Sequence, residues 1–224
     1  MPLQNRVTPF GAIERDPARG LLMGNRGGRL HDAATRTLTR RRWASHHWII
    51  CRTAFRGRRR PVMAARSYTE LFFLDEVTAL AAGHRPCYEC QRHRAQHFAA
   101  AFAAGLGTDA MRADVIDRQL HGERRACGHQ SPTLSVEELM DLPNGVMVAD
   151  GADSFAFRDG RLLPWTHSGY RAPVTPAQFA GRSLTQLTPA STVNAMRQGF
   201  APRFHPSAAC VHPSAACVHP SAAS

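Results

Sequence analysis

Residues 71–97 read LFFLDEVTALAAGHRPCYECQRHRAQH, and the order of signals in this stretch decides how the rest of the chain is interpreted. The apolar run at its start predicts a short strand over 71–74, followed by Asp75 as a helix N-cap. A helix is expected over 76–82, and Gly83 then supplies the left-handed residue that ends it. The sequence therefore predicts a strand, a tight helix and a glycine stop directly before a pair of cysteines.

The cysteine pair is Cys87-Tyr-Glu-Cys90, a C-x₂-C entered through Pro86. Two thiolates at this spacing can chelate one tetrahedral ion, because the intervening turn brings both sulfurs to the same side. The apolar spacing of 91–102 predicts a helix after the pair, so the cysteines should lie on a knuckle between two helices. Zinc is the expected cofactor. His93 could be a further ligand or, equally, part of a basic surface.

The segment Ala79-Leu-Ala-Ala-Gly-His-Arg-Pro-Cys87-Tyr-Glu-Cys90, with Phe72-Phe73 and Glu76 before it, resembles the zinc-binding module of Ada-type DNA-repair proteins. The resemblance extends more weakly over residues 47–98. It implies a small α+β zinc fold with four cysteines, one of which accepts a methyl group from a DNA phosphotriester. DNA repair and a DNA partner are thus the expectations that the resemblance carries.

Cys51 lies 36 residues before Cys87 and matches the first cysteine of a C-x₃-C that this module carries upstream. The resemblance therefore gives Cys51, Cys87 and Cys90 as metal ligands and Cys51 as the candidate methyl acceptor. The second cysteine of the C-x₃-C would fall at position 55, which is Phe55. A missing thiolate makes the remaining sulfurs less nucleophilic, which argues against methyl-acceptor activity. Cys51 could instead be a small buried strand residue.

The fourth metal ligand is assigned to His93. The other candidates are His31, His47, His97, Cys127 and His129.

The net charge is +11, and all 28 basic residues are arginines. Between residues 33 and 69 there is no Asp or Glu, whereas ten arginines occur, with Trp43 and Trp48 interleaved. Uncompensated positive charge of this density favours a surface that contacts phosphates, although a solvated strand edge would give the same pattern. The expected partner is therefore nucleic acid, with DNA favoured by the resemblance. The candidate contacts are Arg56, Arg58, Arg59, Arg60, Arg85 and Arg92.

Outside this region the local sequence patterns mainly predict secondary structure. Residues 1–20 resemble an irregular arm, and the glycine-rich stretch 24–32 resembles a tight turn. Residues 43–55 and 60–68 are expected to form the two strands of a hairpin around Gly57.

Later segments alternate between helical and β signals. Helices are expected over 108–124 and 188–198, a capping box at 135–138, and a hairpin over 154–165 that turns at Asp159-Gly160.

The expected fold is α+β. It has a small zinc-stabilised antiparallel sheet with helices, followed by a helical segment and a small β-rich C-terminal part. The expected boundaries are an arm and glycine-rich loop over 1–39, the Ada-like module over 40–104, the second part over 105–204 and a disordered heptapeptide-repeat tail over 205–224.

Two other functions remain open. One is a metal-dependent nuclease or hydrolase that uses His31 and Asp32, or Asp117 with His121 and Glu123. The other is a structural zinc protein that binds another protein. No apolar run suits a membrane helix and no secretory signal is visible, so a cytoplasmic location is expected.

Overall fold

The computed structural model describes residues 1–57, 61–126 and 131–209, and within them the fold is mixed α+β with two six-stranded sheets. Strand order in the first sheet is β2-β1-β5-β3-β4-β6. Its strands are β1 Gln4–Val7, β2 Ile13–Arg15, β3 Leu22–Arg26, β4 Trp48–Arg52, β5 Leu71–Phe73 and β6 Arg85–Pro86. This confirms the expected fold class, although the first sheet is larger than expected and is not purely antiparallel, because β1 pairs with β5 and β4 with β6 in parallel.

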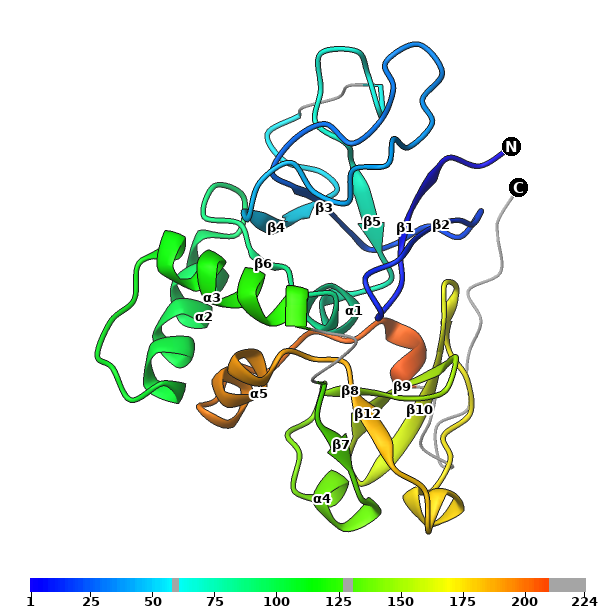
Figure 1. Cartoon of the computed structure of the whole chain (residues 1–224), viewed down its shortest axis with the longest axis vertical. Helices are drawn as coiled ribbons and strands as arrows, with labels where there is room; N and C mark the ends of the chain where they lie inside the picture. The colour runs from blue at the N-terminus through cyan, green and yellow to red at the C-terminus, as the bar shows by residue number, and fades with distance from the viewer. Residues whose placement is uncertain (58–60, 127–130, 210–224) are drawn as a thin grey trace.

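The second sheet has the order β11-β10-β9-β8-β12-β7. Its strands are β7 Thr133–Leu134, β8 Met147–Asp150, β9 Asp153–Arg158, β10 Arg161–Thr166, β11 Gly169–Tyr170 and β12 Leu184–Gln186. The α-helices of the described ranges are α1 Glu76–Ala81, α2 Arg92–Gly105, α3 Ala113–Ala126, α4 Val136–Met140 and α5 Ala190–Arg197. Figure 1 shows α1 between the two sheets, with α2, α3 and α5 grouped at one side of the molecule.

The expectation of an irregular arm over 1–20 was wrong, because β1 and β2 are strands of the first sheet. The glycine-rich stretch 24–32 begins inside β3, and the expected turn is confined to a bend at Gly27, which has a φ of 77°, and Gly28. Glycine in β3 serves close packing. A Cβ at Gly24 would lie 2.1 Å from the carbonyl oxygen of Ile49 in the paired strand β4. Only glycine lets the two backbones approach this closely, so a residue typical of turns lies inside a central strand.

The expected return strand over 60–68 was also wrong. Its described part, from Pro61 onward, forms turns instead of a strand, and Met63 has a φ of 55°. A left-handed residue two positions after a proline, which lacks a backbone donor, cannot continue a regular ladder of hydrogen bonds. The turns are held by the buried Glu70, whose carboxylate accepts from the backbone N–H of Met63 at 2.7 Å and from the hydroxyl of Ser67 at 2.5 Å.

The stretch that follows confirms the sequence prediction closely. β5 leads into Asp75, whose carboxylate accepts from the backbone N–H of Thr78 at 2.8 Å and caps α1. Gly83 follows the helix with a φ of 78°, which is the left-handed conformation expected of it. The capping box at Ser135 and the turn at Asp159-Gly160 are present as well.

The two sheets are joined through α1. Besides capping that helix, Asp75 accepts from the Tyr170 hydroxyl at 2.8 Å and from the backbone N–H of His205 at 2.9 Å. The chain after α5 thus returns along α1, as the orange-red segment of Figure 1 shows. The disorder expected from residue 205 was wrong for the start of the repeat tail, because Pro206–Ala208 form a 3₁₀-helix and the hydroxyl of Ser207 accepts from the backbone N–H of Tyr170 at 2.8 Å. From residue 210 onward the prediction lies outside the described residues. No helix in the described ranges is long and apolar enough to cross a membrane.

Candidate metal centre

The first cysteine is positioned by the register of two parallel strands. β4 pairs with β6 so that Ile49 lies opposite Arg85 and Ile50 opposite Pro86. The ladder continues by one bond, since the backbone N–H of Cys87 donates to the carbonyl of Ile50 at 2.9 Å. Cys51 at the end of β4 therefore lies beside the start of the C-x₂-C, although 36 residues separate them in the chain.

The knuckle that carries Cys87 and Cys90 is fixed by Gln91, which precedes α2. Its backbone N–H donates to the Cys87 carbonyl at 3.0 Å, and its side-chain amide donates to the carbonyl of Ile50 at 3.0 Å. Two backbone amides also reach the sulfurs. Glu89 N–H donates to Cys87 Sγ at 3.3 Å, and Arg52 N–H donates to Cys90 Sγ at 3.4 Å. Such bonds favour the thiolate form, which is the form that binds metals.

The sulfurs of Cys51, Cys87 and Cys90 all lie within 4.8 Å of one another. Zinc–sulfur bonds of about 2.3 Å at tetrahedral angles place the sulfurs roughly 3.8 Å apart, so a small closure suffices to bind an ion. Cys51 and Cys87 are buried and Cys90 is partly exposed. A set of soft thiolates is consistent with zinc, and the three cysteines could hold such an ion.

Electrostatic coupling among the sulfurs separates their protonation. Hydrogen bonding to Cys87 and then to Cys90 raises the pKa of Cys51. The same contact from Cys51 lowers the pKa of Cys87 to about 5, with the backbone amides of the knuckle adding to the effect. The pKa of Cys90 is lowered too, chiefly by its hydrogen bond with Cys51. The thiol of Cys51 is therefore the one whose protonated form these contacts favour, whereas they favour the thiolates of Cys87 and Cys90.

The three cysteines line a cavity of about 370 Å³ between the first sheet and the turns over 53–57 and 61–70. Its apolar lining includes Phe55, Val62 and Phe72, and Glu70 and Asn25 supply polar groups. Within the described residues the group of metal-ligating side chains contains the three cysteines and no fourth member. Zinc sites with three protein ligands and a neighbouring cavity are typical of centres that bind an external molecule in the fourth position.

The structure brings the three predicted cysteines together, but it does not bring the histidines to them. His93 and His97 are exposed on α2, and neither belongs to the sulfur group. His47 is half-exposed, with Nδ1 2.8 Å from the carboxylate of Asp117. Cys127 and His129 lie outside the described residues.

The predicted arginine contacts are dispersed. Arg56 and Arg92 are exposed, whereas Arg58, Arg59 and Arg60 lie outside the described residues. Arg85 is buried and binds Asp117 through two hydrogen bonds of 2.8 and 2.7 Å, so its charge is already paired. The arginines of 33–69 that the structure describes are all exposed and form no ion pair with a described carboxylate.

The residues considered for a metal-dependent hydrolase do not converge. His31 is buried against the hydroxyl of Thr69 at 2.7 Å, whereas Asp32 is exposed and caps a turn. The carboxylate of Asp117 is occupied by Arg85. His121 packs edge-on against Trp43, with ring centroids 5.3 Å apart.

Sequence reasoning missed Glu70, the buried carboxylate that lines the cavity. It precedes a strand of the first sheet, and the turns over 61–69 bring it beside the cysteines. Its burial depends on these tertiary contacts, so no local sequence pattern marked it.

Comparisons of the chain with models of known protein families, with curated proteins and with solved structures gave no match. The metal centre is therefore interpreted from its own residues.

Proposed function

We propose that the chain is a zinc protein that binds nucleic acid and is related to the Ada-type module, with an external molecule completing the zinc shell. The observation that carries the proposal is the convergence of three thiolates, from two distant segments, on the wall of a cavity. The relationship is supported by the order of the parts, a strand cysteine beside a Pro-Cys-x₂-Cys knuckle that precedes a helix.

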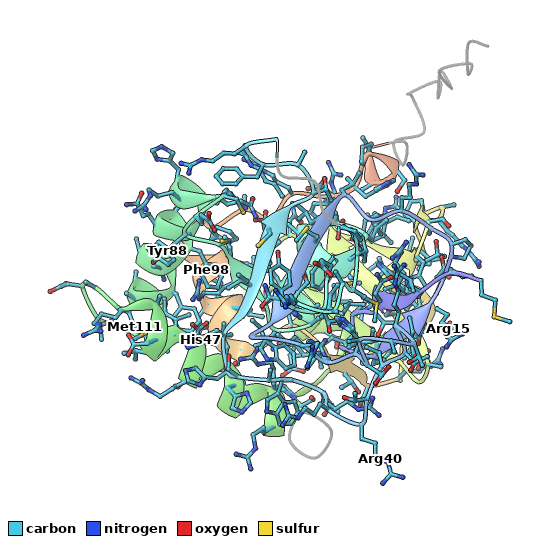
Figure 2. All side chains as sticks on the ribbon, turned by 90° about the horizontal axis from the view of Figure 1, so that it is seen from above. Arg15, Arg40, His47, Tyr88, Phe98 and Met111 are labelled. Atoms are coloured by element: carbon cyan, nitrogen blue, oxygen red, sulfur yellow. The ribbon has the colours of Figure 1, made fainter. Side chains whose placement is uncertain are left out.

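The nucleic-acid partner is supported by the exposed arginines of 33–69. Their charges repel one another unless a polyanion neutralises them, and a backbone of phosphates would do so. Figure 2 shows one of them, Arg40, extending away from the body of the protein. Arg85 is left out of this surface, because Asp117 already neutralises it.

Methyl transfer to Cys51 is not part of the proposal. Three thiolates carry less negative charge than four, and a zinc ion would withdraw electron density from each of them. What the site offers instead is an open position on a Lewis acid beside a cavity lined by apolar side chains.

Metal content tests the centre. The parent for this test is the full chain with Cys210→Ser and Cys217→Ser, so that the repeat tail offers no thiolates. We expect one zinc per chain, lost on Cys51→Ser and on Cys87→Ser but kept on His93→Ala. Zinc retained in Cys51→Ser would remove Cys51 from the site and overturn the three-thiolate centre.

Replacing zinc with cobalt then shows whether the fourth coordination position of the metal is open. An added small ligand such as azide should shift the d–d absorption bands if that position is open. Unchanged bands would mean that a protein side chain closes the shell, with Cys127→Ser as the variant that identifies it.

Nucleic-acid binding is tested by the salt dependence of affinity for a labelled duplex. Each phosphate contact contributes a slope of about 0.9 in a plot of log affinity against log salt. A variant with Arg40→Gln, Arg41→Gln and Arg56→Gln should lower the slope by roughly 2 to 3. Arg197→Gln, at an exposed position on α5, is the control for total charge. Equal effects per charge at both places would refute a localised surface.

A metal-dependent hydrolase is the second candidate, because Glu70 lines the cavity that the cysteines border. A zinc-bound water has a pKa of about 7, and a carboxylate nearby could accept its proton. Cleavage of a nucleic-acid substrate that is lost both in Cys87→Ser and in Glu70→Gln would favour this candidate. Cleavage that persists in Cys87→Ser would exclude it.

A further inference from the structure

A second cavity lies between the two sheets, away from the cysteines. It measures about 580 Å³ and is lined by residues of β3, β4, α1 and α3 on one side and of β7, β8 and β12 on the other. Clefts between structural units are frequent ligand sites, and this volume suits a small organic molecule. None of its lining residues borders the cavity of the metal centre.

The cleft is strongly positive. Arg26, Arg42 and Arg124 line it, and no acidic residue is among the described residues that do. Arg26 is only 2% exposed, yet its described hydrogen-bond partners are all uncharged. They are the carbonyls of Gly11 at 2.8 Å and Arg42 at 3.5 Å, and Nε2 of His84 at 3.4 Å.

A buried cation with only neutral partners is costly, because the interior solvates charge poorly. Burial, followed by the fields of Arg124 and Arg42, lowers the pKa of Arg26 to about 9. Burial also lowers the pKa of Arg124 to about 9, although Asp117 and Glu123 oppose the shift there. An anion in the cleft would relieve this repulsion, so the free protein is already organised to receive one.

The same cleft presents aromatic surface. The guanidiniums of Arg26 and Arg124 lie over the ring of Trp48, with their central carbons 4.0 and 3.9 Å from its centroid. Trp43 lines the cleft as well, 6.3 Å from Trp48 between ring centroids, and is 41% exposed. A large aromatic side chain left accessible beside cations is suited to stacking on a flat ring.

We propose that this cleft binds one nucleotide unit, with the base stacked on Trp43 and the phosphate directed to Arg42 and the buried arginines behind it. The phosphate accounts for the uncompensated charge, and the base accounts for the accessible tryptophan. A free mononucleotide and the terminal nucleotide of a strand carry the same chemistry. The inference needs neither the zinc site nor duplex binding, and so it stands or falls separately from the proposed function.

Calorimetric titration of the full chain with AMP tests the inference, with adenosine and inorganic phosphate as half-ligand probes. We expect AMP to bind more tightly than either half. Arg42→Gln should weaken AMP binding by about tenfold through the loss of a charge-assisted contact. Trp43→Ala should weaken it by about tenfold or more through lost stacking. Both side chains are exposed, so the fold should tolerate these changes.

Arg197→Gln is the control, because it removes the same charge from an exposed position that does not line the cleft. Equal weakening by Arg197→Gln and Arg42→Gln, or no effect of Trp43→Ala, would overturn the inference. Titration with a 5′-phosphorylated pentanucleotide distinguishes a free mononucleotide from the terminal nucleotide of a strand as the ligand. Binding of AMP supports a free nucleotide, and binding of the pentanucleotide alone, still sensitive to Trp43→Ala, supports a strand end. No binding of either probe would refute the site.

Discussion

Replacing Asp117 with asparagine should destabilise the fold by about 3 to 5 kcal/mol, the usual cost of breaking one side of a buried ion pair. The side chain of Asp117 is 1% exposed and that of its partner Arg85 is 8% exposed. Both guanidinium contacts, at 2.8 and 2.7 Å, would face an amide instead of a carboxylate. Arg85 would then remain buried and charged, because water has little access to it.

The contact of Asp117 with His47 adds little to this figure. The His47 side chain is 49% exposed, so solvent screens whatever charge it carries. Most of the cost therefore comes from Arg85, which lies on β6 two residues before Cys87, and the partly buried Arg124, whose charge Asp117 also stabilises, adds to it. The pair fixes the strand that presents the C-x₂-C, and the loss should be seen in the stability of the whole protein.

Urea denaturation of the full chain and of the variant, under one set of metal conditions, measures the effect. With a denaturant slope of about 2 kcal/mol per molar, the midpoint should fall by roughly 2 M. Asp114→Asn is the matched control on the same helix, since its partners Arg112 and Arg118 are exposed and solvent screens these pairs, so its midpoint should barely move. Equal losses in the two variants would refute the claim that burial sets the cost.

Two further predictions concern buried positions. Burial and two neighbouring guanidiniums hold the pKa of His84 well below its usual value, so below about pH 6.5 only the unfolded chain takes up this proton. This group should therefore lower the free energy of unfolding by about 1.4 kcal/mol for each unit that the pH falls. Urea unfolding between pH 7 and 5.5 should show that stability depends less steeply on pH in His84→Gln than in the parent protein. Identical slopes in the two proteins would count against the assignment. Gly24→Ala should cost about 1 to 3 kcal/mol, because its Cβ would meet the Ile49 carbonyl, whereas Gly122→Ala, with open space on α3, should stabilise by about 1 kcal/mol. Thermal or urea unfolding separates the two glycines, and losses of the same sign would contradict the packing argument.

Features encoded by neighbouring residues were predictable from the sequence. The Asp75 cap, the glycine stop at Gly83 and the capping box at Ser135 each need only three or four residues, and all three are present. Signals of this kind depend on backbone groups within one turn of helix, so the rest of the fold cannot easily override them.

Pairing between distant segments was not predictable in the same way. Gly24 has the appearance of a turn residue until β4 is placed against it. Likewise, turns at 62–63, with Met63 in the left-handed conformation, and at 65–66 interrupt what the sequence alone suggested was a strand. In both places the deciding contact is tertiary, which a single sequence does not contain.

The residues of the candidate metal centre likewise differ in how far local sequence predicted them. The spacing of Cys87 and Cys90 predicted a chelating pair by itself, and the pair lies as expected. Cys51 was added through a resemblance, and its place is explained by the parallel register of β4 and β6. Glu70 and the Arg85–Asp117 pair could not be anticipated, because nothing local connects those residues to the cysteines.

β4 connects the two cavities through the alternation of its side chains. Ile49 and Cys51 face the cavity of the metal centre, whereas Trp48 lines the cleft between the sheets. A strand of five residues thus serves as the common wall of a candidate zinc site and a candidate nucleotide site. Because a shift of one residue in its register would exchange the two faces, the close approach of β3 at Gly24 and the bond from Cys87 to Ile50 hold both sites at once. The sequence Trp-Ile-Ile-Cys is for this reason constrained twice, by the chemistry on each side of the sheet.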